Sequence, residues 1–212
     1  MQCLHSIRHA GRMIENSDTR NMETLKKLLL FTVATVAAIA LILWTWDSFG
    51  FRNPVSAFLV NWLAMSWMAV IGQVVHLSFV PGYYRAKPFE RTGQVYERLG
   101  IRLFKNLVRR GPLAIFSPTL RFPKEKTVSA LQGLLGEMQK AETGHALVFV
   151  LVLLFIGYGL LKGWLDAVAW MLLFNILING YPIMLQRYNR IKLQELIQQQ
   201  DSGGATPCGV TP

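Results

Sequence analysis

The chain has 212 residues, of which 52% are hydrophobic and only 16% are charged, against roughly 25% charged residues in an ordinary globular protein. Its 22 lysines and arginines exceed its 12 aspartates and glutamates, and the net charge of +10 would suit nucleic acid, an anionic membrane or an acidic ligand. This composition excludes a disordered chain and disfavours a soluble enzyme. Cys3 and Cys208 lie near opposite ends, which supports neither a disulfide scaffold nor a CxxC site.

Four uncharged stretches approach or exceed the length of about 20 apolar residues that crosses a bilayer. They are residues 28–46, 55–80, 146–161 and 167–185. The third is short, but Lys162 can snorkel and let Trp164 and Leu165 extend it. Short turns at 47–54 and 162–166 join the spans in pairs. The sequence predicts an all-α, polytopic integral membrane protein with about four transmembrane helices and a basic amphipathic cytoplasmic segment.

The positions of lysine and arginine predict the orientation. Five precede residue 28, twelve lie in 81–144 and three follow residue 185, whereas the two short turns hold one each. Because basic loops stay in the cytoplasm, we expect a multi-pass protein of the cell membrane with both termini cytoplasmic. A cleaved signal peptide is not expected, because the first span begins too late. The expected parts are a cytoplasmic extension (1–27), a first hairpin (28–80), the basic segment (81–144), a second hairpin (145–185) and a C-terminal motif with a flexible tail (186–212).

The basic segment carries apolar side chains at roughly helical spacing. They are Phe89, Val95, Tyr96, Leu99, Leu103, Leu107 and Val108. Their mixture with arginine and lysine resembles an amphipathic helix in the lipid headgroup layer. The alternative is a solvated, charged connector. A second helical run, 127–142, should lead directly into the third span.

Polar side chains follow one face of two spans. In the second span they are Asn61, Ser66, Gln73 and His76, and in the fourth Asn175, Asn179, Pro182, Gln186 and Arg190. Pro182 leaves the carbonyl of Ile178 without its usual helical partner, which favours a kink. The two stripes either line a cavity open to the cytoplasm or form interhelical hydrogen bonds.

Glu142 and His145 are the best acid–base candidates, because a spacing of three places them on one helical face. A carboxylate can orient an imidazole, whose other nitrogen then removes a proton from a hydroxyl. The alternative is an interfacial ion pair. No second cluster supports a metal, even with His76 added.

Residues 187–190, Arg-Tyr-Asn-Arg, lie where the fourth span ends. Arginine suits phosphate or carboxylate, although these residues could simply anchor the helix. A GxSxG elbow, a Walker loop and a nucleic-acid-binding motif are all missing from the sequence, so no nucleic-acid partner is expected.

Several motifs occur in a recognisable order between about residues 81 and 196. Residues 186–193, QRYNRIKL, resemble a QRYNRxRL ending, preceded by Asn179 and Pro182 as an N…P approach. Residues 137–145, EMQKAETGH, resemble ExxRAExxH, and residues 89–105 resemble an FE+xGxx(W/Y) block. Together they resemble the glycosyl-4,4'-diaponeurosporenoate acyltransferase family. Residues 1–25 and the tail lie outside this resemblance, and the second span is only loosely similar.

The resemblance implies acyl transfer to the glucose 6-hydroxyl of a glycosylated C30 carotenoid acid, the last step toward a staphyloxanthin-like pigment, or acylation of a related glycolipid. The expected partners are membrane lipid, that acceptor and an acyl thioester donor, either acyl-CoA or acyl-carrier protein, with no bound cofactor or metal. Two other classes stay open: a non-catalytic membrane partner of a lipid or pigment pathway, and another small transferase, such as a lipid methyltransferase that consumes S-adenosylmethionine.

Matching positions and chemistry then suggest roles within such a reaction. His145 would accept the proton of the sugar hydroxyl while Glu142 orients its ring. The residues expected to hold donor phosphate or to stabilise the oxyanion are Arg187 and Arg190, with Arg98 and Arg102 as further candidates. The residues expected to contact the sugar are Asn179, Gln186 and Asn189, and Tyr188 is expected to bind substrate as well.

Overall fold

The computed structural model describes residues 2–75, 77–110 and 127–203, and within these ranges every regular element is a helix. The elements are α1 (Gln2–Phe49), α2 (Pro54–Val74), the 3₁₀ turn η1 (Pro81–Tyr84), α3 (Gln94–Arg98), α4 (Ile101–Arg110), α5 (Val128–Leu161), α6 (Leu165–Asn175), the π-helix η4 (Ile176–Gly180) and α7 (Tyr181–Gly203). His76 and the expected flexible tail beyond residue 203 lie outside the described residues.

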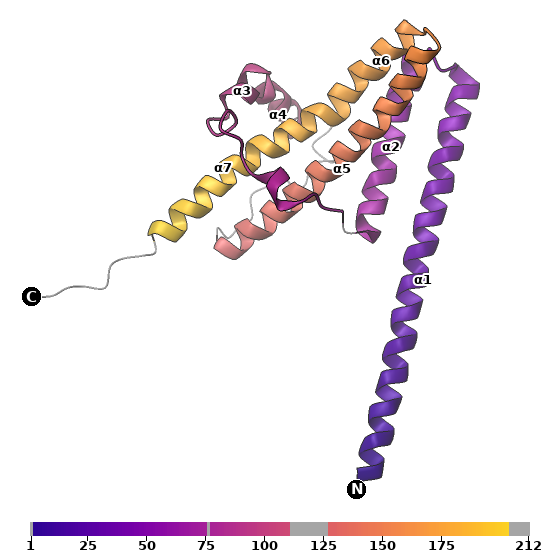
Figure 1. Ribbon diagram of the computed structural model, residues 1–212, viewed down its shortest axis with the longest axis vertical. Helices are drawn as coiled ribbons and strands as arrows, with labels where there is room; N and C mark the ends of the chain where they lie inside the picture. Colours follow the sequence, from indigo (N-terminus) through magenta and orange to yellow (C-terminus); the bar gives the residue numbers. More distant parts are fainter. Residues whose placement is uncertain (1, 76, 111–126, 204–212) are drawn as a thin grey trace, which may run out of the picture.

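Four helical segments are long and apolar enough to cross a membrane, which confirms the predicted fold class. They are 21–49 in α1, all of α2, α5, and the continuous run 165–199 through α6, η4 and α7. Figure 1 shows two hairpins, α1–α2 and α5–α6, whose turns lie at the same end of the molecule. There the Arg52 side chain donates to both carboxylate oxygens of Asp166, at 3.1 and 2.8 Å, and links the two turns.

The predicted helix boundaries need two corrections. The second span ends at Val74 rather than Val80, because Val75 is extended and its N–H closes the last turn on the Ile71 carbonyl. The first helix starts long before residue 28 and includes the expected cytoplasmic extension. The predicted run 127–142 does lead directly into the third span, and the two form one helix, α5, which begins where the Thr127 hydroxyl accepts from the Ala130 N–H.

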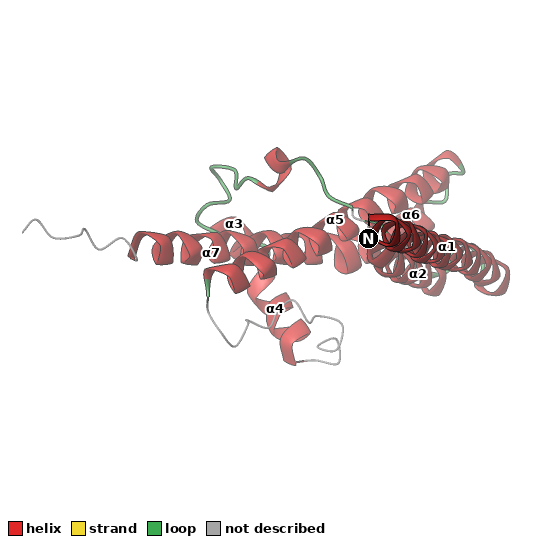
Figure 2. Ribbon diagram, turned by 90° about the horizontal axis from the view of Figure 1, so that it is seen from below, coloured by secondary structure: helices red, strands yellow, loops and turns green. Residues whose placement is uncertain are grey.

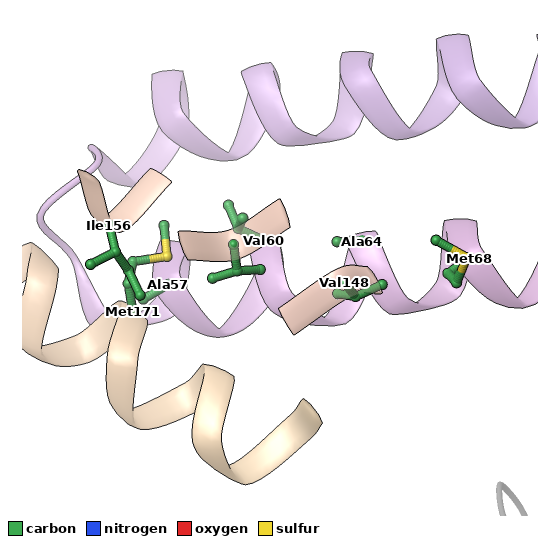
Figure 3. Packing of buried hydrophobic residues seen from close by; sticks show 8 residues of the cluster. Ala57, Val60, Ala64, Met68, Val148, Ile156 and Met171 are labelled. Atoms are coloured by element: carbon green, nitrogen blue, oxygen red, sulfur yellow. The ribbon is translucent and has the colours of Figure 1, made fainter. Parts of the chain in front are cut away.

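The membrane core forms where α2, α5 and α6 meet, and Figure 3 shows eight of its residues. They are Ala57, Val60, Ala64, Met68, Val148, Val152, Ile156 and Met171. On α5 they recur every fourth residue, and on α2 every third or fourth, so each helix presents a continuous apolar face. Small residues on α2 let the neighbouring helices approach closely, as in other membrane bundles.

The α5–α7 pair continues beyond the membrane. At 1.5 Å per residue, the 34 residues of α5 extend about 50 Å, whereas the hydrocarbon layer is about 30 Å thick. The extension is held together by its own cluster of Leu131, Met138 and Leu193. The pair therefore continues outside the bilayer, and α3 and α4 pack against α7 (Figure 2).

Within the described residues 89–110, the basic segment forms two short helices, α3 and α4, rather than one. Gly100 separates α3 from α4 with a positive φ of 79°, and Tyr96 and Ile101 pack on Tyr188 and Ile191 of α7. The leucines of the predicted amphipathic pattern stay exposed: Leu99, Leu103 and Leu107 are 50%, 77% and 56% accessible. One face of α3 and α4 therefore packs on α7, and another face exposes apolar side chains.

The irregularity predicted at Pro182 is a π-helical turn. In η4 the N–H of Tyr181 bonds the carbonyl of Ile176, five residues earlier, and α7 continues from there. Such a turn shifts the helix face by one residue. Asn175 and Asn179, which lie at the start of this turn and within it, are both fully buried.

Candidate active site

A chain of amide side chains crosses the helix bundle in the membrane. Asn61 of α2, Asn175 of α6 and Asn179 of η4 are each fully buried, and together we call them the asparagine chain. The amide nitrogen of Asn179 donates to the side-chain oxygens of Asn61 at 3.2 Å and Asn175 at 2.9 Å. The polar stripes therefore meet as interhelical hydrogen bonds at these positions, whereas Ser66 and Gln73 of the second span are exposed.

His145 of α5 lies beside Asn179, the middle member of the asparagine chain. Its Nδ1 lies 3.4 Å from Oδ1 of Asn179, and the ring remains partly exposed. The backbone carbonyl of Ile178, whose α-helical donor is missing at Pro182, is a second acceptor beside the ring. Among the described residues, no hydrogen bond joins His145 to Glu142. The side chain in contact with the His145 ring is therefore that of Asn179 rather than that of Glu142.

Glu142 instead belongs to an ionic cluster with Glu90, Arg187 and Arg190. The Nε and Nη2 atoms of Arg190 donate to Oε2 of Glu142 at 3.2 and 3.0 Å. The Nε of Arg187 lies 3.6 Å from Oε1 of Glu142 and 3.4 Å from Oε1 of Glu90. Two carboxylates and two guanidinium groups balance in charge, which compensates for their removal from water.

The ionic cluster fastens the segment after α2 onto the α5–α7 pair. Arg190 donates to the carbonyl of Tyr84, and Arg187 donates to that of Tyr83 at 3.2 Å. Glu90 also accepts from the Tyr96 hydroxyl at 2.8 Å and from the N–H of Lys87 at 3.0 Å. The cluster thereby fixes the whole path from η1 to α3.

Hydroxyl groups complete the inner face of this segment. The Thr143 hydroxyl donates to the carbonyl of Gln139, so the hydrogen it shares with Tyr84 must come from the tyrosine. Tyr84 in turn accepts from the N–H of Phe79 at 2.9 Å. Burial and the neighbouring carboxylate of Glu142 raise the pKa of Tyr83, and burial and Glu90 raise that of Tyr96. Both hydroxyls are therefore protonated donors at neutral pH.

Tyr188 and Asn189 of the QRYNR motif, residues 186–190, form a second contact region, separate from the ionic cluster. The Tyr188 hydroxyl donates to Glu97 at 2.7 Å, and Arg102 pairs with the same carboxylate at 2.7 Å. These two contacts, the tyrosine first, lower the pKa of Glu97. Asn189 accepts from Lys105 of α4 at 3.1 Å. Tyr188 and Asn189 thus hold α3 and α4 against α7.

The predicted site residues therefore fall into three places. His145 and Asn179 lie together in the membrane, Glu142, Arg187 and Arg190 form the ionic cluster, and Gln186 is buried nearby. Tyr188, Asn189 and Arg102 belong to the contact with α3 and α4, whereas Arg98 is exposed. All three nitrogens of the Arg190 guanidinium face protein acceptors. Arg187, with a side chain 13% exposed, keeps some access to solvent.

Sequence reasoning missed three residues that the structure places in these networks. Glu90 lay within the FE+xGxx(W/Y) block without an assigned role, and its burial among Arg187, Tyr96 and the backbone of Lys87 became visible only in the structure. Asn61 and Asn175 were noted as polar positions. Asn175 lies one helical turn from Asn179, whereas only the packing of α2 against the fourth span brings Asn61 to it.

A hollow of about 320 Å³ opens beside the ionic cluster. Its lining includes Tyr84 and Arg85 from the η1 region, with Gln139 of α5 and Gln194 of α7. Polar groups from three elements thus surround a space large enough for part of a ligand. Within the described ranges, no three metal-ligating side chains gather closely enough to hold an ion.

Comparison with known proteins identifies the family. Residues 81–199 match the family model described as glycosyl-4,4'-diaponeurosporenoate acyltransferase. No curated protein and no solved structure matches the chain. The matched region contains η1, the ionic cluster, His145 and Asn179, and it covers more than half of the 212 residues. The chain therefore belongs to the glycosyl-4,4'-diaponeurosporenoate acyltransferase family, an acyltransferase family of carotenoid biosynthesis.

Proposed function

We propose that this protein transfers a fatty acyl group to the glucose 6-hydroxyl of a glycosylated C30 carotenoid acid, or to the same position of a related glycolipid. The observation that carries the proposal is the family match over residues 81–199, which includes the ionic cluster, His145 and two of the three members of the asparagine chain. The four apolar helices support it further, because a carotenoid glycoside and a fatty acyl chain both belong in a bilayer.

His145 is the proposed general base. Its ring removes the proton of the sugar hydroxyl as that oxygen attacks the thioester carbonyl carbon. The new C–O bond forms, the C–S bond breaks, and the proton returns from the ring to the departing thiolate. The acyl-CoA or acyl-carrier protein is a co-substrate, so the balanced step needs no bound cofactor.

The remaining polar residues bind and orient. Arg187, which keeps some exposure, is the proposed contact for donor phosphate or the developing oxyanion, with Arg98 and Arg102 as outer cationic groups. Gln186, Tyr188 and Asn189 are assigned here to shaping the region near the sugar. Arg190 and Glu142 hold this region in place from inside the ionic cluster.

The proposed orientation places the termini and the basic segment in the cytoplasm of the cell membrane. Twenty of the 22 basic residues lie in those parts. Acyl thioesters are cytoplasmic, so the donor then reaches the ionic cluster and the hollow from the water side. The apolar part of the acceptor enters from the bilayer.

Mass spectrometry of lipid extracts tests the proposal in a host that makes the glycosylated C30 carotenoid acid. Cells with the protein should contain a species in which one acyl group replaces a hydroxyl hydrogen, and cells without it should not. Fragmentation should locate the ester on the sugar. If membrane expression is verified and no acylated product forms from this acceptor or from other glycolipids, the proposal is wrong. A methylated product would instead identify a methyltransferase.

A further inference from the structure

The directions of the hydrogen bonds in the asparagine chain are determined at its two ends. The amide nitrogen of Asn61 donates to the carbonyl of Ala57 at 2.9 Å, and that of Asn175 donates to the carbonyl of Phe149 at 3.1 Å. A backbone carbonyl can only accept, so each of these amides must turn its nitrogen toward that carbonyl. Both side-chain oxygens are then left facing Asn179.

Asn179 consequently has only one favourable amide orientation. Its nitrogen must donate to the oxygens of Asn61 and Asn175, because a flipped amide would place oxygen against oxygen at both contacts. All three side chains are fully buried, so water does not offer an alternative partner. The oxygen of Asn179 therefore points at Nδ1 of His145.

An oxygen acceptor facing Nδ1 requires a proton on that nitrogen. In the neutral ring Nε2 then carries the lone pair that can accept a proton. The other tautomer would set the lone pair of Nδ1 against the oxygen of Asn179. The network thus favours the tautomer with a proton on Nδ1.

We propose that Asn61, Asn175 and Asn179 are positioning residues that hold His145 in its Nδ1-protonated tautomer, with Nε2 free to act as the base. This inference rests on the proposed function for the use of that base, but the tautomer itself is a property of the resting protein. It also gives Asn179 a role different from the sugar contact expected from the sequence.

The tautomer can be read directly by nitrogen-15 NMR of histidine-labelled protein in lipid nanodiscs. The His145 signals are assigned by their loss in His145→Gln. At neutral pH the wild type should show a protonated Nδ1 and an unprotonated Nε2. Asn179→Leu should show both tautomers, and Asn61→Leu, which removes one of the two acceptors for Asn179, should show a smaller change. Gln73→Leu, an exposed position on α2, is the matched control and should leave the spectrum unchanged.

Activity provides the second readout. Asn179→Leu should lower kcat by about tenfold, part of the roughly 10²–10⁴ that a general base contributes, with little change in KM. A wild-type ring protonated at Nε2, or at both nitrogens, overturns the inference, as does an unchanged tautomer in Asn179→Leu. If that variant does not fold, the wild-type spectrum and Asn61→Leu still decide. If the protein shows the expected tautomer but has no acyltransferase activity, only the proposed function is contradicted.

Discussion

Glu142 and Arg190 are buried as a pair, with side chains 0% and 1% exposed, so each depends on the other for compensation of its charge. Arg190→Leu should destabilise the protein by about 3–5 kcal/mol, because it leaves the carboxylate of Glu142 in a site without its main cation. The double variant Glu142→Leu with Arg190→Leu should recover much of this loss, since no uncompensated charge remains. The free energy of unfolding in detergent measures both effects.

Glu137 and Lys140 provide the control on the same helix. Their ion pair is shorter, at 2.7 Å against 3.0 Å, but both side chains are more than half exposed. Lys140→Leu should therefore change the free energy of unfolding by only about 0–1 kcal/mol. If Lys140→Leu and Arg190→Leu lower the free energy of unfolding equally, burial does not increase the contribution of the Glu142–Arg190 pair to stability.

At the scale of single residues, the sequence identified polar positions but not their partners. The spacing of Glu142 and His145 placed them on one helical face, yet the two side chains belong to different networks. Nothing in the local sequence brings Asn61 within reach of Asn179, because that contact depends on how α2 packs against the second hairpin. Arg187 and Arg190 were predicted as ligand contacts, and their links to Glu90 and Glu142 became visible only in the fold.

The contact between α3 and α7 depends on Gly93. This residue has a φ of 69°, and a Cβ added there would lie 2.9 Å from Cε2 of Tyr188. Gly93→Ala should therefore combine left-handed strain of about 1–2 kcal/mol with displacement of the Tyr188 ring. We expect a loss of unfolding free energy together with faster proteolysis between α3 and α4.

Gly100 separates these two effects. Its φ is 79°, but a Cβ would meet no atom within 4 Å. Gly100→Ala should show the backbone strain alone and so a smaller loss than Gly93→Ala. If the two variants lose the same stability, the close approach of Gly93 to Tyr188 does not matter.

The leucines of α4 form an exposed stripe that the structure leaves without a protein partner among the described residues. The carbonyl of Leu99 accepts from the Tyr181 hydroxyl, which places the start of α4 near the end of the fourth span. We therefore expect the side chains of Leu103 and Leu107 to insert into the lipid, with Arg102 at the level of the headgroups. A fluorescent label on Leu103→Cys, in a background without Cys3 and Cys208, should be quenched by spin-labelled lipids.

Glu195→Cys is the reference for that label, because it is exposed on α7 beyond the membrane. It should not be quenched. Equal quenching at both positions, or none at Leu103→Cys, would place α4 in water. At this scale the sequence predicted the amphipathic character correctly, but not the break at Gly100, which depends on its left-handed backbone.

At the scale of the whole molecule, the distribution of basic residues predicts the topology. Single cysteines introduced at Arg52 and Lys162 should react with a membrane-impermeant thiol reagent added to intact cells. Cysteines at Lys140 and Glu195 should react only after the cells are permeabilised. The reverse pattern would contradict the proposed orientation and the cytoplasmic supply of the donor.

The four spans and their pairing were predictable from composition, because uncharged stretches of this length have few other uses. The arrangement of the basic segment was not predictable from composition. It depends on contacts of Arg187 with Glu90 and with the backbone of Tyr83, both of which are far from Arg187 in sequence. The early end of α2 was also missed, because residues 75–80 are as apolar as the helix before them.

The most direct test of the account measures acyl transfer by purified protein in nanodiscs, with acyl thioester and the glycosylated C30 carotenoid acid supplied. Thiol release and ester formation are followed together for wild type, His145→Gln and the control Lys140→Gln. The account predicts that His145→Gln lowers kcat by about 10²–10⁴ at an unchanged unfolding midpoint, whereas Lys140→Gln retains wild-type activity. Full activity in His145→Gln would contradict the assignment of this histidine as the base.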